Sequence, residues 1–512
     1  MDNYKKRERG GMRVQAPLAD RVVTTDLASD FSLPDYRPEI KRLLRVRACV
    51  MPISHYVGVG NAEMSGKVEY SILYAGHDGG LYCVTHSEDL AFSVPVEMGS
   101  DFELGDGLVC DVQSLCESAS GRVAAPRRLA LKCRVRSRVR ILGTRVLSEP
   151  LGGMAEPEIE RLTADALCGS HFVGLGDPLV LGDEILYDGG DLRVIYAEGQ
   201  VFVTEATAGS GVVNCNGEVA LKLLCVREGS EEAPMVHNRR LPFSAVVGVE
   251  GAEVNCDASA TGVCSQIDVK VEEGRLLCEA SVLLQARAQR NESLSYTRDL
   301  YSTRAECTPK YTDLCLPRAL RCLNANFSLN QTQSQEELGI RTGAAIVDLS
   351  MIPAVQELVC ERGKYLLLGR CRCHAVLFDG EEYAAQEFEL PFRFETAGGT
   401  DEVADHDVDV SVISCRARMD GERVGIDAEL CVSLVTRGEA RFSAVSEAVL
   451  GEACERSCVG YTVCYPSRDD TLWSVAKRYR ASVASVAEAN ALAGAPAADS
   501  KESLSGVSYL LV

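Results

Sequence analysis

The sequence contains little tryptophan and few aromatic residues: one of its 512 residues is Trp, and 6% are aromatic. It also lacks any apolar run that approaches the roughly 20 residues of a membrane-spanning helix. Its first residues, Met1 to Arg13, are rich in Lys and Arg, but the apolar segment of a secretory signal does not follow them. We therefore expect a chain without a membrane span that begins in a cytosol.

Sequence motifs of catalysis are also missing. There is no P-loop, no GxGxxG after an expected strand, and no GxSxG. Cys373 and His374 are neighbours on an expected strand, so their side chains point to opposite faces and cannot form a nucleophile–base pair. The acidic segment Asp401 to Asp409 is expected to be a solvated turn, with a weak cation site as the alternative. We expect neither an enzyme nor a bound cofactor.

The 22 cysteines are not arranged as metal ligands, because no CxxC pair occurs. Only Cys371 and Cys373, and then Cys454 and Cys458, lie close together. The pattern favours buried, reduced thiols that pack as small apolar residues. Late oxidative cross-linking and metal binding are the alternatives.

The charge is strongly unbalanced, with 53 basic and 74 acidic residues giving a net charge of −21. Nucleic-acid binding requires clustered Lys and Arg, so nucleic acid is not expected as a general partner. The apolar fraction of 46% is enough for substantial cores. A chain of this length is expected to form several domains.

An internal repeat of about 150 residues runs through most of the chain. Phe92, Phe243 and Phe392 follow similar residues and lie 151 and 149 residues apart. Two further sets of landmarks keep the same step: Gly66, Gly217 and Gly369, and Arg128, Arg275 and Arg423. The period is too long for a solenoid, so we expect tandem whole domains.

Alternating apolar and polar residues within each copy predict half-buried strands. The predicted fold is mainly β and multidomain, with three antiparallel sandwich-like or barrel-like modules. Connections are expected to be partly helical, for example Glu156 to Leu167. The expected boundaries are a flexible tail over 1–24, modules over 25–150, 165–300 and 318–445, and a small C-terminal module over 457–512.

The last segment has a different pattern, which predicts a βααβ unit. Tyr461 to Val463 is expected to be a strand, and Asp470 or Thr471 to cap a helix with an apolar face. A second helix from Val483 to Asn490 and a closing strand from Tyr509 to Val512 complete the unit.

This unit resembles a LysM domain through Tyr461-Thr462-Val463, Asp470 to Ala476, Tyr479, and Asn490 with Leu492. Two positions depart from the family pattern. Asp469 stands where LysM domains usually have Gly, and Leu504 to Val507 replaces their usual Pro-Gly turn. Both positions border the groove that holds N-acetylglucosamine polymers in wall-binding members, which makes glycan binding by this unit doubtful.

The upstream modules resemble SPOCS domains of spore-forming Firmicutes. The resemblance rests on Phe31 to Asp35 with Pro38 to Ile40, on Gly66 to Tyr74, and on Leu90 with Phe92. Three such domains followed by a LysM-like domain resemble the SipL type of spore-coat morphogenetic protein over nearly the entire chain. This resemblance implies a mother-cell adaptor whose LysM-like domain binds the ATPase that coats the forespore. Other coat proteins are further candidate partners, and a peptidoglycan-binding LysM protein is the alternative function.

Two sets of residues are candidate binding sites. In the C-terminal unit, Trp473 is expected to be a core anchor, with a partly exposed binding role as the alternative. The candidate partner-binding residues there are Arg468, Asp469, Asp470, Thr471, Leu472, Trp473 and Asn490. The second set is a basic face formed by alternation along one strand: Lys132, Arg134, Arg136, Arg138 and Arg140. This face is either neutralised by the chain's own carboxylates or free to bind an acidic partner.

Overall fold

The computed structural model describes residues 11–99, 102, 107–148, 159–188, 191–229, 233–272, 274–400, 402–454, 460, 462–492, 498–504 and 506–512. It is mainly β, with 75% of residues in strands and 4% in helices. The sheets are antiparallel, as expected for strands that alternate apolar and polar side chains. The prediction of a mainly β, multidomain protein is confirmed.

Module 1 contains seven strands in two sheets, one ordered β1-β7-β6 and the other built around β4, which pairs with β2, β3 and β5. Its strands are β1 (Gly11–Ser32), β2 (Ile40–Val50), β3 (Ser54–Val57), β4 (Asn61–Gly76), β5 (Leu81–Pro95), β6 (Val109–Ala125) and β7 (Arg128–Ser148).

Modules 2 and 3 repeat this arrangement, with the orders β8-β14-β13 and β10-β11-β12 in module 2, and β15-β20-β19 and β16-β17-β18 in module 3. All three modules share six equivalent strands; module 1 adds β3, which pairs with β4, and module 2 adds one strand that pairs with β14. Its strands are β8 (Ile159–Leu175), β9 (Leu179–Leu186), β10 (Leu192–Ala208), β11 (Val212–Arg227), β12 (Met235–Gly248), β13 (Asp257–Glu272) and β14 (Arg275–Ser302). Those of module 3 are β15 (Ala305–Ser334), β16 (Ala345–Glu361), β17 (Lys364–Phe378), β18 (Tyr383–Ala397), β19 (Asp405–Asp420) and β20 (Arg423–Ala453).

Two predictions about the segments that flank the modules are wrong. The expected tail over 1–24 is, from Gly11 onward, part of β1, which pairs with β7 along its whole length. The expected helix over Glu156 to Leu167 is, from Ile159 onward, part of β8, which pairs with β14. In both cases the partner strand lies more than a hundred residues away, so a local pattern could not reveal the pairing. Residues 1–10 and 156–158 lie outside the described residues.

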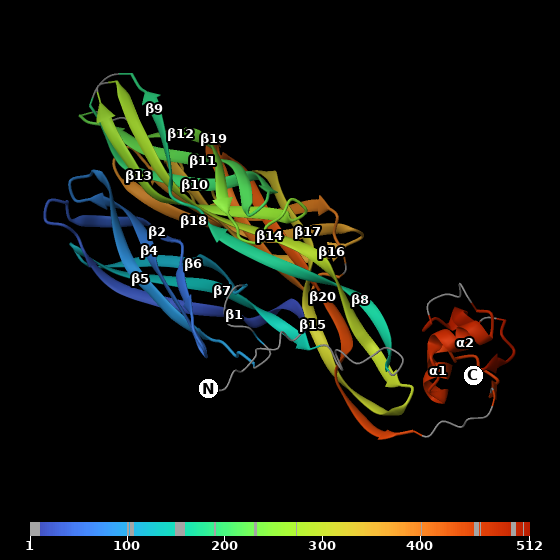
Figure 1. Ribbon diagram of the computed structural model, residues 1–512. Coiled ribbons are helices and arrows are strands. Elements are labelled where there is room, and N and C mark those ends of the chain that lie inside the picture. Colours follow the sequence, from blue (N-terminus) through green and yellow to red (C-terminus); the bar gives the residue numbers. More distant parts are fainter. Residues whose placement is uncertain are drawn as a thin grey trace, which may run out of the picture.

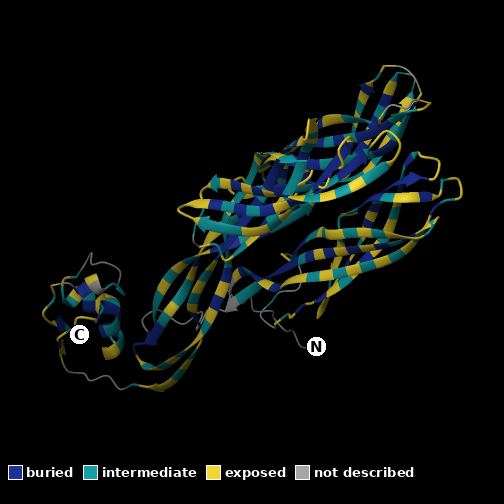
Figure 2. Cartoon of the chain, turned by 180° about the vertical axis from the view of Figure 1, so that it is seen from behind, coloured by how far each residue is buried: buried dark blue, intermediate teal, exposed yellow. Residues whose placement is uncertain are grey.

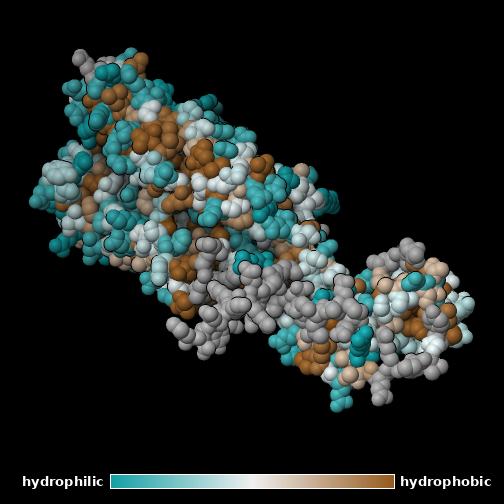
Figure 3. All heavy atoms as spheres, in the orientation of Figure 1, coloured by the Kyte–Doolittle hydropathy of each residue, from teal (hydrophilic) through white to brown (hydrophobic). Residues whose placement is uncertain are grey.

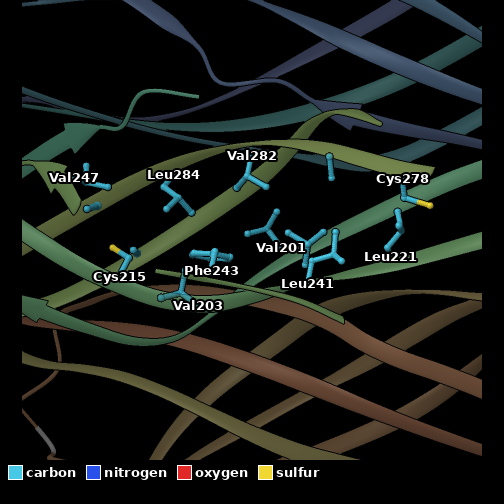
Figure 4. Close-up of a cluster of buried hydrophobic side chains, with 14 of the residues drawn as sticks. Val201, Val203, Cys215, Leu221, Leu241, Phe243, Val247, Cys278, Val282 and Leu284 are labelled. Carbon is cyan, nitrogen blue, oxygen red and sulfur yellow. The ribbon is translucent and has the colours of Figure 1, made fainter. Parts of the chain in front are cut away.

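Each module buries an apolar core between its two sheets. In module 2 the core includes Val201, Leu221 and Phe243 from one sheet, and Leu276 and Val282 from the other. Figure 4 shows most of these side chains pointing toward one another. Burial alternates along most strands, as Figure 2 shows by the changing colours of the ribbons. Gly217, one of the repeat landmarks, lies where an added Cβ would be 2.4 Å from a backbone oxygen, so only glycine fits without movement.

The three modules form a closed ring. The equivalent strands β5, β12 and β18 each contact the next module. β5 contacts β10, β12 contacts β16, and β18 contacts β2. An apolar cluster at the centre draws on all three modules: Leu44 and Leu73 from module 1, Ile195 and Leu224 from module 2, and Val347 and Val376 from module 3. These residues are repeat equivalents, spaced by 151 or 152 positions. The ring therefore has an approximate threefold axis.

The C-terminal module has the order β21 (Val463–Cys464), α1 (Leu472–Tyr479), α2 (Val483–Ala489) and β22 (Leu510–Leu511), with a short 3-10 helix at Lys501–Leu504. β21 and β22 pair in an antiparallel sheet. Figure 1 shows this module beyond the ends of β8, β14, β15 and β20, away from the sandwiches. It is therefore positioned at one tip of an elongated molecule.

Candidate partner-binding surfaces

The start of α1 is fixed by local hydrogen bonds. Thr471 is the N-cap residue: its side chain accepts from the Ser474 amide, and its own amide donates to the Ser474 hydroxyl. Asp470 is buried and accepts from the Ser467 amide at 2.8 Å and from Arg478 at 2.5 Å. The hydrogen bond from Arg478 lowers the pKa of Asp470 to about 2, so this carboxylate stays charged.

Trp473 is buried and anchors the C-terminal module to module 2. Only 6% of the residue is exposed, and its ring packs edge-on against Tyr301 of β14 at 5.0 Å. Its indole N–H donates to Asp299 at 2.9 Å, and Lys477 also donates to this carboxylate. Trp473 thus holds the C-terminal module onto the end of β14 and is not exposed to a partner.

Asn490 also has an internal role. Its amide nitrogen donates to the carbonyls of Val486 and Leu511, and its side-chain oxygen accepts from the Leu511 amide. These bonds tie the end of α2 to β22. Leu472 is buried as well, so within the predicted set only Arg468 and Asp469 are exposed.

The exposed apolar and aromatic side chains of this module lie outside the predicted partner-binding set. Val463 pairs with Leu511 and Cys464 with Leu510 across β21 and β22, and Tyr465 and Tyr509 directly adjoin the last of these pairs. Tyr465 is 77% exposed, Tyr509 is 56% exposed, and Val463 is 50% exposed. Tyr479, 41% exposed, lies beside Cys464.

We call Val463, Tyr465 and Tyr509 the tyrosine patch. Tyr479 does not belong to it, because Cys464 is buried and points to the other face of this short sheet. Figure 3 shows apolar residues reaching the surface of this module and, in scattered areas, of the modules in the ring. A sequence signal was present, because Tyr465 and Tyr509 directly flank the two short strands, but the pairing of these strands was needed to bring them together.

The basic strand lies on β7 and divides into two parts. Lys132, Arg134 and Arg136 are exposed, and the guanidinium of Arg134 binds Asp26 on the neighbouring strand at 2.7 Å. The nearest acid to Arg136 is Glu117, at 4.0 Å. This outer part is solvated and partly neutralised within module 1.

The inner part of the strand binds module 3. Arg138 and Arg140 bind Asp405 and Asp407, with distances of 2.7 Å from Arg138 to Asp405 and 3.1 Å from Arg140 to Asp407. Burial would raise the pKa of Asp407, but Arg437 and Arg140 outweigh it and lower the pKa to about 2. The prediction that the basic face is free to bind an acidic partner is therefore wrong for Arg138 and Arg140. The alternative holds, because the chain's own carboxylates neutralise these two side chains.

The acidic segment is part of the same interface. Asp405 and Asp407 lie in β19 and bind the basic strand, so this part of the segment is neither a solvated turn nor a cation site. Asp401 lies outside the described residues. Among the residues that the structure describes, no group of three or more His, Cys, Asp and Glu side chains could hold a metal ion.

Cys373 and His374 have separate environments and do not form a catalytic pair. Cys373 is fully buried in the core of module 3, while the Nδ1 atom of its neighbour His374 lies 3.2 Å from Glu387. Every described cysteine is a free thiol, and of these only Cys49 and Cys315 are exposed. Burial raises the pKa of the Cys371 thiol to about 12, which makes it a poor nucleophile.

Comparisons with protein-family models, with curated proteins and with solved structures found no match. Among the described helices, none is long and apolar enough to cross a membrane.

Proposed function

We propose that this protein is a non-enzymatic assembly adaptor of the spore coat, related to SipL-type proteins. It works in the mother-cell cytoplasm and binds the morphogenetic ATPase that coats the forespore, helping to localise and encase the coat. The C-terminal module supplies the contact with the ATPase, and the ring of three modules connects this contact to the coat. Other coat proteins are candidate partners of the ring.

The observation that carries this proposal is the tyrosine patch. Tyrosine is enriched among the residues that dominate protein–protein binding energy, because its large ring becomes buried while its hydroxyl can still hydrogen-bond. Arg468 is exposed in the same module and can contribute to a polar rim. The module that carries the patch lies at one tip of an elongated molecule (Figure 1).

The backbone around α1 supports a protein partner over a sugar. The amide of Trp473 donates to the Ala498 carbonyl at 2.8 Å, and the amide of Leu472 donates to the Ser503 hydroxyl at 3.1 Å. The segment around the 3-10 helix therefore already occupies these two donors. Leu504, at one of the departures from the LysM pattern, is buried in the module's core.

The test compares full-length variants for binding to the purified ATPase. Tyr465→Ser and Tyr509→Ser should each weaken binding at least tenfold, because truncating a hot-spot tyrosine at the centre of an interface costs about 2 kcal/mol or more. The matched control is Tyr56→Ser, which removes a tyrosine that is 71% exposed in module 1. Wild-type affinity in both patch variants would refute the assignment. Sedimentation of the wild-type chain with peptidoglycan, lost in the patch variants, would support the wall-binding function instead.

A further inference from the structure

A cavity of about 160 Å³ lies between the three modules near the axis of the ring. Every module contributes walls to it, from β1 and β7, from β8 and β14, and from β15 and β20. One buried water occupies about 10–15 Å³ on this scale, so the cavity has room for a small molecule. Ala404, Cys315 and Glu439, which also line it, are exposed and form its rim.

The cavity is lined by three equivalent cross-strand pairs, one from each module. They are Pro17 with Leu142, His171 with Gln289, and Ala319 with Arg437. Leu142, Gln289 and Arg437 are spaced by 147 and 148 positions, the same step as the arginine landmarks of the repeat. The cavity is therefore a consequence of the ring, placed where the equivalent strands of the three modules converge.

The three pairs differ in chemistry, so the cavity has one apolar wall and one polar wall. Module 1 supplies Pro17 and Leu142, and Leu316 of module 3 adds to this apolar wall. Modules 2 and 3 supply an imidazole, an amide and a guanidinium. These side chains are more than nine-tenths buried, with 5% exposure for His171, 2% for Gln289 and 6% for Arg437.

The polar wall has spare hydrogen-bond donors. Arg437 uses one terminal nitrogen to bind Asp407 at 2.5 Å, but its Nε and other terminal nitrogen have no partner among the described residues. The amide nitrogen of Gln289 also has none there. Unmatched buried donors are costly, so a bound group that brings acceptors would be favoured.

The charges around the cavity already balance one another. Arg140 binds Asp20 and Asp407, and the Nε2 atom of His171 lies 3.1 Å from Asp111. Asp111 in turn binds Arg287 at 3.0 Å. A highly charged ion would disturb this balance, whereas one carboxylate can use the spare donors of Arg437 and Gln289.

We propose that this cavity binds a small organic carboxylate. Its carboxylate accepts hydrogen bonds from Arg437 and Gln289, and its apolar part packs against Pro17, Leu142 and Leu316. Charge-assisted hydrogen bonds of this type are stronger than neutral ones, and the apolar wall offers no partner to water. Such a ligand would touch all three modules and stabilise the ring.

The first test uses the full-length protein with three probes: benzoate, benzyl alcohol and inorganic phosphate. Benzoate should bind saturably in calorimetry and raise the unfolding temperature. Benzyl alcohol has the same apolar body without the carboxylate, and phosphate has the charge without the body, so both should bind at least tenfold more weakly. Failure of benzoate to bind at millimolar concentration would overturn the proposal, as would equal binding of benzyl alcohol.

The second test uses variants taken from the repeat itself. Gln289→Leu introduces the residue that module 1 has at the equivalent position, Leu142. Arg437→Gln introduces the residue that module 2 has there, Gln289. Each variant therefore has a side chain that the ring already accommodates at an equivalent position. Each should weaken benzoate binding about tenfold through the lost donor. Arg134→Ala, on the outer part of the basic strand, is the control and should bind as the wild type does. Wild-type affinity in the folded Gln289→Leu protein would show that benzoate binds elsewhere and overturn the proposal.

Discussion

The centre of the ring contains a buried charge network whose loss should loosen all three modules. Arg45, Tyr196 and Asp348 occupy equivalent positions of the three modules, spaced by 151 and 152 residues. Arg45 donates to Asp348 at 2.7 Å, the Tyr196 hydroxyl donates to the same carboxylate at 2.5 Å, and the Arg45 guanidinium lies 4.8 Å from the Tyr196 ring centroid. Lys222 also binds Asp348. One carboxylate therefore serves two cations and a hydroxyl.

The change to make is Asp348→Asn, which keeps the shape and removes the charge. The side chain of Asp348 is fully buried and that of Arg45 is 3% exposed, so water cannot replace the lost partner. Breaking a buried ion pair by removing one member costs about 3–5 kcal/mol, because a buried charge is left without compensation. We expect a loss of this order in the free energy of unfolding.

The matched control is Glu382→Gln, which breaks another ion pair between modules 1 and 3. Glu382 binds Lys41 at 2.7 Å, but their side chains are 48% and 43% exposed. An exposed pair of this kind contributes at most about 1 kcal/mol. Urea unfolding followed by far-ultraviolet circular dichroism should give a clearly lower midpoint for Asp348→Asn and almost no change for Glu382→Gln. Equal midpoints for the two variants would refute the reasoning.

Three further predictions concern other parts of the chain. The pKa of Asp407 is lowered to about 2 from an ordinary 3.8, so its contribution of about 2 kcal/mol to the free energy of unfolding is present above pH 4 and lost as the pH falls toward 2. In an acid titration, Asp407→Asn should therefore lose less stability in that window than the wild type does. Identical profiles would contradict this. Asp299→Ala should release the C-terminal module from module 2, with a shift of the Trp473 emission and a larger radius of gyration in X-ray scattering; an unchanged radius would argue against this anchor. Gly174→Ala should destabilise module 2, because the new Cβ would lie 1.9 Å from the Gly248 carbonyl oxygen, whereas Gly248→Ala meets nothing within 4 Å and should unfold at nearly the wild-type temperature.

The sequence allowed the architecture to be predicted because its main signals are local or periodic. Alternation marked the strands, and the 150-residue step marked three equivalent units. The same step also relates residues at the centre of the ring, such as Leu44, Ile195 and Val347. That these positions meet could not be foreseen, because a repeat spacing does not say which faces of the modules touch.

The candidate sites were less predictable for the same reason. The basic strand and the acidic segment were each visible, but Arg138 and Asp405 lie 267 residues apart and only the folded ring brings them together. Trp473 was correctly expected to be a core anchor, but its partners Asp299 and Tyr301 belong to another module. The tyrosine patch depends on the pairing of two strands of two residues each, which are too short to give a periodic signal.

Hydrogen–deuterium exchange of the full-length protein, alone and with the ATPase, tests the central claim most directly. We expect ATPase binding to slow exchange in β21 and β22 and to leave the central strands β2, β10 and β16 equally protected in both states. Protection that appears instead on β7, with the C-terminal module unchanged, would contradict the assignment of the binding surface.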